Sequence, residues 1–179
     1  MTQITLAVTG SISAYKAADI TSQLTKLGLE VKVLMTPASR KFITPLTLQV
    51  LSKNPVGLDV MVEEDPQRIE HIDIGKETDL FLVAPASANT IAKLAMGLAD
   101  NMVTSTALAL PQGTKKILAP AMNTKMLEHP ATQRNLKLLQ DYGYQIIQPR
   151  HATLACGDQG SGALATVESI VKAVKEHCL

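Results

Sequence analysis

Compact hydroxyl and amide side chains follow a strongly apolar run near the middle of the chain. The five residues Leu80–Ala84 are all apolar, and Ser87, Asn89 and Thr90 come shortly after them. An uninterrupted apolar run of this length predicts a strand that is buried on both faces. Pro85 is expected to end the strand, so these polar residues would lie at the N-terminus of the next helix. Such a helix N-terminus is a usual place for an α/β protein to bind an anion. A turn in which Ser87 or Asn89 only caps the helix is the alternative.

A second turn of similar composition follows the first predicted strand. Gly10 is the only glycine in this turn, where the dinucleotide-binding motif requires three. Lys16 lacks the preceding glycine and the following Ser or Thr of a Walker A loop. The hydroxyls of Thr9, Ser11 and Ser13 would surround a helix N-terminus, which suits one phosphate monoester better than a pyrophosphate. A capped helix without a ligand is the alternative.

Two further strands are predicted to end in similar turns. Thr36-Pro37-Ala38-Ser39 follows one of them, and Ala119-Pro120-Ala121-Met122-Asn123 ends the other. The second turn repeats the Ala-Pro-Ala sequence of Ala84-Pro85-Ala86. Because the carboxyl ends of parallel strands lie at one edge of a sheet, we expect the two Ala-Pro-Ala turns and the turn at Gly10 to face a common crevice. Asn123 acting only as a helix cap is the alternative.

Two other side chains have the chemistry of proton donors or acceptors. His71 lies in a run of alternating polar and apolar residues, a few residues before the central apolar run. A single histidine in such a place is more often structural than catalytic. Cys156 lies in the segment Pro149–Ala163, which has three glycines within six residues and is long for a loop. We expect this segment to be a mobile lid that leaves Cys156 partly exposed and reactive, although most cysteines are buried and inert.

The elements that must position these residues alternate between strands and helices. This order predicts an α/β protein with a three-layer, Rossmann-like (flavodoxin-like) fold, in which helices cover both faces of a mostly parallel sheet. The expected strands span residues 4–8, 30–35, 58–62, 80–84, 116–120 and 144–148. The expected helices span residues 14–27, a segment from 45 onward, 91–96, 101–110, 130–142 and 166–177.

Composition limits the class of protein. A chain of 179 residues with 46% apolar residues is expected to form one domain over residues 1–179. A net charge of +1 gives no indication of a nucleic-acid or membrane partner, and the apolar runs are too short to span a membrane. The two cysteines suggest neither a disulfide framework nor a metal site. No signal sequence is recognisable at the start, so we expect a cytoplasmic enzyme or binding protein.

Five blocks of the sequence together resemble one family, the homo-oligomeric flavin-containing cysteine decarboxylases. They occur in the family's order and cover nearly the whole chain: 10–16, His71, 85–90, 120–126 and 155–158. Within the family, the resemblance is to members that act in coenzyme A biosynthesis. Leu127 is a departure, because the family usually has Trp there. The chain ends at Leu179 and therefore resembles a stand-alone member rather than a fusion with a synthetase domain.

The resemblance implies a cofactor and a set of site residues. The cofactor is FMN, and the implied binding residues are Gly10, Ser11, Ile12, Thr36, Ser39, Ser87, Ala88, Asn89, Thr90 and Ala121. The implied catalytic residues are His71, Asn123 and Cys156, and the implied substrate-binding residues are Asn123, Thr153, Leu154 and Ala155. Family members form trimers with the flavin at a subunit interface, so we expect a homotrimer or an assembly of trimers.

The reaction implied by the resemblance is decarboxylation of 4′-phosphopantothenoyl-L-cysteine to 4′-phosphopantetheine and carbon dioxide. In the family, the substrate thiol is oxidised to a thioaldehyde by hydride transfer to FMN, and its C=S bond accepts the electrons left when carbon dioxide departs. The resulting enethiolate is reduced by FMNH2. His71 would assist deprotonation or orient the carboxylate, Asn123 would hold the carboxylate, and Cys156 would donate a proton during the reduction.

Four other functions are alternatives. A relative that decarboxylates the C-terminal cysteine of a peptide is disfavoured by the block Ala155–Asp158, because completing the second hydride transfer belongs to the coenzyme A enzymes. A flavin prenyltransferase is disfavoured by Cys156 and the block Pro120–Met126. Inhibitory subunits of phosphatases typically carry long acidic tails, which this sequence lacks. The last alternative is a Rossmann-like binding protein without catalysis.

Overall fold

A six-stranded sheet forms the centre of the protein, in a computed structural model that describes residues 2–63 and 65–178. Its strand order is β3-β2-β1-β4-β5-β6, and every neighbouring pair is parallel. The order reverses between β1 and β4, which is where open parallel sheets bind ligands at their carboxyl edge. The strands are β1 (Gln3–Val8), β2 (Glu30–Met35), β3 (Val56–Gly57), β4 (Leu80–Ala86), β5 (Lys115–Pro120) and β6 (Tyr144–Ile146).

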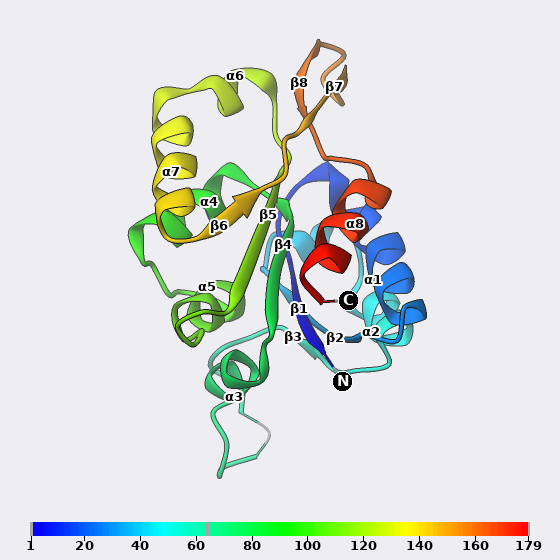
Figure 1. Cartoon of the computed structure of the whole chain (residues 1–179), viewed down its shortest axis with the longest axis vertical. Helices are drawn as coiled ribbons and strands as arrows, with labels where there is room; N and C mark the ends of the chain where they lie inside the picture. The colour runs from blue at the N-terminus through cyan, green and yellow to red at the C-terminus, as the bar shows by residue number, and fades with distance from the viewer. Residues whose placement is uncertain (1, 64, 179) are drawn as a thin grey trace.

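Helices cover both faces of this sheet, as Figure 1 shows. On one face lie α1 (Ala17–Lys26), α2 (Pro45–Ser52) and α8 (Val167–Cys178). On the other face lie α3 (Glu70–Glu77), α4 (Ala88–Met96), α5 (Met102–Leu108) and α7 (Pro130–Asp141). The shorter helices are η1 (Ile12–Lys16), η2 (Ser39–Lys41) and α6 (Thr124–Glu128). This three-layer α/β architecture confirms the predicted fold class.

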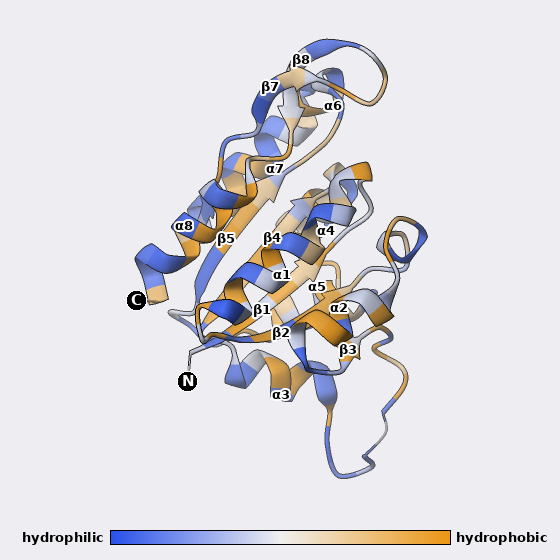
Figure 2. Ribbon diagram, turned by 90° about the vertical axis from the view of Figure 1, so that its right-hand side faces the viewer, coloured by the Kyte–Doolittle hydropathy of each residue, from blue (hydrophilic) through white to orange (hydrophobic). Residues whose placement is uncertain are grey.

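The core explains why the strands are apolar on both faces. Along β1, Leu6 packs in the cluster that includes α1 and α8, whereas its neighbour Ala7 packs in the cluster that includes α4 and α5. Phe81 and Leu82 divide between the same two clusters in β4. Figure 2 shows the hydrophobic colour along the strands and on helix sides that face them. Because both faces are covered, a parallel strand needs apolar residues at consecutive positions.

Three strand predictions differ from the structure, and the first is the strand at 144–148, which ends at Ile146. The predicted strand at 58–62 does not form, and β3 consists only of Val56 and Gly57. β4 does not end before Pro85 but continues to Ala86, which pairs with Pro120 of β5. The register between β4 and β5 shifts between Val83 and Ala86. An irregularity of this kind accommodates a proline, which has no N–H to donate.

The segment that carries Cys156 is more regular than predicted. It forms an antiparallel hairpin of β7 (Arg150–Thr153) and β8 (Gln159–Ala163) rather than an irregular loop. Leu154 donates its N–H to the carbonyl of Asp158 at 2.8 Å, and Gly157 donates to the carbonyl of Leu154 at 2.8 Å, which closes the turn. Figure 1 shows this hairpin beside α6 at one end of the molecule, with α3 at the other end.

The described residues contain neither a candidate membrane-spanning helix nor a candidate metal-binding cluster. None of their helices combines the length and the apolar character required to cross a membrane. Within residues 2–63 and 65–178, no group of three or more His, Cys, Asp or Glu side chains is arranged to hold a metal ion.

Candidate active site

Thr9 joins the ends of β1 and β4. Its buried hydroxyl donates to the carbonyl of Pro85 at 2.7 Å and accepts the N–H of Ser87 at 2.8 Å. The hydroxyl of Thr9 therefore holds two turns together, and it is not directed to a ligand as the sequence suggested. The hydroxyl of Ser11 accepts the N–H of Ser13 at 3.3 Å and caps η1.

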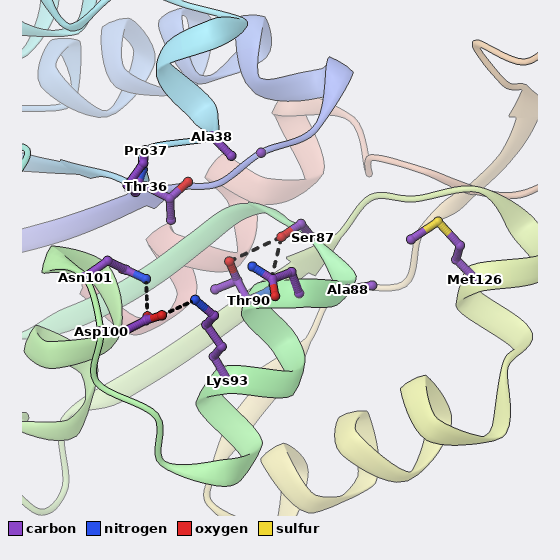
Figure 3. Close-up of a pocket in the computed structure, with 12 residues that line it drawn as sticks. Thr36, Pro37, Ala38, Ser87, Ala88, Thr90, Lys93, Asp100, Asn101 and Met126 are labelled. Carbon is purple, nitrogen blue, oxygen red and sulfur yellow. Dashed lines mark hydrogen bonds and ion pairs between the residues drawn. The ribbon is translucent and has the colours of Figure 1, made fainter.

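An open pocket of about 360 Å³ lies at the carboxyl edge of β1, β2 and β4. Ser87 caps α4 beside it, accepting the N–H of Thr90 at 3.2 Å, and its hydroxyl also contacts that of Thr90 (Figure 3). Six residues predicted for cofactor binding line the pocket: Gly10, Thr36, Ser87, Ala88, Asn89 and Thr90. The turns after β1, β2 and β4 thus share one pocket, whereas the turn after β5, which was predicted to face the same crevice, does not line it.

The remaining four predicted cofactor residues do not line this pocket. Ser39 is buried, and its hydroxyl donates to the carbonyl of Thr36 at 2.8 Å. Ala121 is also buried and donates its N–H to the carbonyl of Ala86 at 3.1 Å, which joins the two Ala-Pro-Ala turns. Ser11 and Ile12 lie on the turn after Gly10, and the side chain of Ile12 is exposed. The contribution of these four to FMN binding stays a prediction.

Three polar residues that line the pocket were not predicted from the sequence, namely Lys93, Asp100 and Asn101. Lys93 forms an ion pair with Asp100, and the amide of Asn101 donates to the other carboxylate oxygen of Asp100 at 2.9 Å (Figure 3). The hydrogen bond from Lys93 lowers the pKa of Asp100 below its ordinary value, and the charge of Lys93 acts in the same direction. The spacing of Ser87, Thr90 and Lys93 was an available signal, because residues three apart share one helix face. The other lining residues that were not predicted are Pro37, Ala38 and Met126.

Asn123 and Cys156 are brought together across 33 residues of sequence. The side-chain amide of Asn123 donates to Sγ of Cys156 at 3.4 Å, while its Oδ1 accepts the N–H of Lys125 at 2.9 Å. Asn123 is therefore both the helix cap of α6 and a neighbour of the thiol. The exposed thiol of Cys156 donates to Oδ2 of Asp158 at 3.4 Å. Thr153, Leu154 and Ala155 lie in the same hairpin, before Cys156.

His71 lies away from the other two predicted catalytic residues. It is the second residue of α3, at the end of the sheet where β4 begins, whereas Asn123 lies beyond the end of β5. The seven residues of β4 span about 20 Å between these two edges. Nδ1 of His71 is buried and has no hydrogen-bond partner among the described residues. A single copy of the chain does not bring His71 to Cys156.

Comparison with known proteins identifies similar chains over the whole length. The sequence model of a family described as Flavoprotein matches residues 1–179. The chain is 63% identical over 175 residues to a probable phosphopantothenoylcysteine decarboxylase of Streptococcus mutans, and the match covers 98% of both chains. It is 46% identical to the coenzyme A biosynthesis bifunctional protein CoaBC of Bacillus subtilis, of whose length it spans 42%.

Solved structures show the same fold. A cysteine-to-serine variant of PPC decarboxylase, complexed with pantothenoylaminoethenethiol, superposes with a TM-score of 0.90 and 32% identity. That match covers 98% of this chain and 97% of the other. The FMN binding protein AtHal3 superposes with a TM-score of 0.86 and 32% identity, over 98% of this chain and 95% of the other.

Proposed function

The chain belongs to the Flavoprotein family, and from this premise we propose that it decarboxylates 4′-phosphopantothenoyl-L-cysteine in coenzyme A biosynthesis, with FMN as cofactor. The main support for this proposal is that the chain is 63% identical to the probable Streptococcus mutans decarboxylase over nearly the full length of both chains. The pairing of Asn123 with Cys156 supplies side chains suited to a carboxylate and to a proton transfer.

The pocket at the carboxyl edge of the sheet fits a phosphorylated cofactor. Ser87, Asn89 and Thr90 offer hydroxyl and amide groups at the N-terminus of α4, where the helix dipole favours an anion. A volume of about 360 Å³ lies within the usual range for cofactor sites. Gly10 allows the turns after β1 and β2 to approach each other closely beside the pocket, because a Cβ there would lie 2.6 Å from Cβ of Ala38. We assign FMN binding to this pocket, together with the neighbouring Ser11, Ile12, Ser39 and Ala121.

Bound FMN supplies hydride acceptance from the thiol-bearing carbon of the substrate and hydride return after carbon dioxide has left. Asn123 holds the substrate carboxylate through its amide, which binds the anion without adding a cation that would oppose its departure. Cys156 donates a proton to the substrate carbon during the reduction, and water then restores the thiol. A structural relative with serine in place of cysteine was solved with an aminoethenethiol, which supports this role. Thr153, Leu154 and Ala155 contact the substrate from the hairpin.

The site requires a second copy of the chain, which provides His71. The separation of about 20 Å between the two edges of the sheet prevents His71 from acting beside Cys156 of its own chain. A trimer, or an assembly of trimers, brings the α3 end of one copy to the pocket of the next. His71 from the neighbouring copy then accepts a proton from the substrate or orients its carboxylate.

Two further parts of the proposal concern organisation and location. Residues 1–179 act as one domain, which is supported by the two core clusters that share one sheet. A cytoplasmic location is supported by the free thiols of Cys156 and Cys178, because reducing compartments maintain thiols.

Spectroscopy combined with a choice of substrates tests the function. The purified protein should show the visible absorption of FMN and should release carbon dioxide from 4′-phosphopantothenoyl-L-cysteine. A synthetic peptide that ends in cysteine is the matched comparison, and it should react far more slowly. A protein that binds no flavin after reconstitution, or that prefers the peptide, contradicts the proposal.

A further inference from the structure

Two hydrogen bonds dock the β7–β8 hairpin on the turn that carries Asn123. The hydroxyl of Thr124 donates to the carbonyl of Ser161 at 2.7 Å. The N–H of Met122 donates to the carbonyl of Gly162 at 2.9 Å. Both bonds lie within one residue of Asn123, so they fix the hairpin directly against the predicted carboxylate ligand.

The hairpin approaches this turn more closely than most side chains permit. A Cβ on Gly160 would lie 2.2 Å from Oγ1 of Thr124, and a Cβ on Gly162 would lie 2.1 Å from the carbonyl oxygen of Met122. Gly162 also has a φ of +140°, which L side chains rarely adopt. Because Gly160 and Gly162 have no side chains, the backbone of β8 can lie within hydrogen-bond distance of the turn that carries Asn123.

This docking determines where the thiol lies. Cys156 is in the turn of the hairpin, and Sγ is 3.4 Å from the amide nitrogen of Asn123. We propose that Thr124 is a positioning residue, whose bond to Ser161 holds the hairpin docked and so keeps Cys156 beside Asn123 before substrate binds. Thr124 acts through Cys156 and does not itself touch the reacting atoms. This inference rests on the proposed function for its catalytic consequence, but the docking itself can be measured without the reaction.

Replacement of Thr124 by Val and by Ser separates the hydroxyl from the shape of the side chain. Thr124→Val removes the donor and nearly preserves the volume, whereas Thr124→Ser keeps the donor and is the matched control. In hydrogen exchange of the FMN-loaded protein, the amide of Met122 reports docking because it donates to Gly162. Loss of one partly buried hydrogen bond should make this amide exchange about two- to tenfold faster in the Val variant. The Ser variant should exchange like the parent.

The ratio of unsaturated to saturated product provides a second readout. A general loss of stability would lower the formation of both products and would leave their ratio unchanged. In a single turnover with 4′-phosphopantothenoyl-L-cysteine, the Val variant should release more unsaturated enethiol relative to saturated product, and each enethiol released leaves one flavin reduced. Carbon dioxide release per bound FMN should change by less than about twofold. The Ser variant should restore the parent ratio. Unchanged exchange at Met122 in the Val variant, or equal defects in the Val and Ser variants, would overturn the inference. If the parent protein releases no carbon dioxide, the proposed function fails, but the exchange result still decides whether Thr124 docks the hairpin.

Discussion

Two variants that each form no saturated product should regain this activity when mixed, if one site contains residues from two copies of the chain. His71→Asn should remove carbon dioxide release, because the site would lack the side chain proposed to accept a proton from the substrate or to orient its carboxylate. Cys156→Ser should release carbon dioxide but form no saturated product. His71 lies about 20 Å from the pocket edge of its own chain, so each functional site would combine Cys156 of one copy with His71 of the next.

The expected recovery follows from random assembly. In an equal mixture, about half of the copies carry the intact cysteine and about half carry the intact histidine, and a head-to-tail ring pairs them independently. About a quarter of the sites then contain both residues, so formation of saturated product should reach about 25% of the parent rate. The variants are unfolded together, refolded with FMN and assayed for 4′-phosphopantetheine by mass spectrometry.

Two controls make the result decisive. Each variant refolded alone should form no saturated product, and native mass spectrometry should show mixed oligomers in the mixture. Mixed oligomers that form no saturated product would refute the shared site. Full activity of His71→Asn alone would refute a role for His71.

Three other perturbations test the cofactor pocket, the core and an ion pair. Gly10→Ala should weaken FMN binding about tenfold or more, measured by flavin fluorescence titration, because the new Cβ would collide with Ala38. Phe81→Ala should lower the free energy of unfolding in urea by about 3–5 kcal/mol, because Phe81 is fully buried in the core. The hydrogen bond from Arg68 lowers the pKa of Asp73, so the pair stabilises the fold above the ordinary Asp pKa and loses this effect as pH falls through the lowered value. Arg68→Gln should therefore reduce urea resistance at pH 7, and the difference from the parent should shrink as the pH falls below the ordinary Asp pKa.

Much of the fold follows from apolar runs and from turn residues. The run Leu80–Ala84 correctly predicts a central strand, because helices on both faces demand apolar residues throughout. Gly97 correctly ends α4, where its φ is +68°. The hairpin of residues 150–163 was missed because glycine-rich strands have low strand propensity, and its contacts with Met122 and Thr124 come from a distant part of the sequence.

Only those site residues that directly follow the ends of parallel strands could be placed from the sequence. Parallel strand ends place Gly10, Thr36 and Ser87 at one edge, and the structure places all three on one pocket. The position of His71 was not predictable from its proximity in sequence to Ser87, because β4 lies between them and separates them by its full length. The contact between Asn123 and Cys156 depends on how the hairpin docks, which no local pattern specifies.

The amounts of the two products test the central claim most directly. The parent enzyme with FMN and 4′-phosphopantothenoyl-L-cysteine should yield carbon dioxide and 4′-phosphopantetheine in equal amounts, without an added reductant, because the hydride taken from the substrate is returned to it. Cys156→Ser should instead yield about one carbon dioxide and one unsaturated enethiol per bound FMN, because the hydride stays on the flavin. Carbon dioxide without saturated product from the parent, or normal saturated product from Cys156→Ser, would contradict the account.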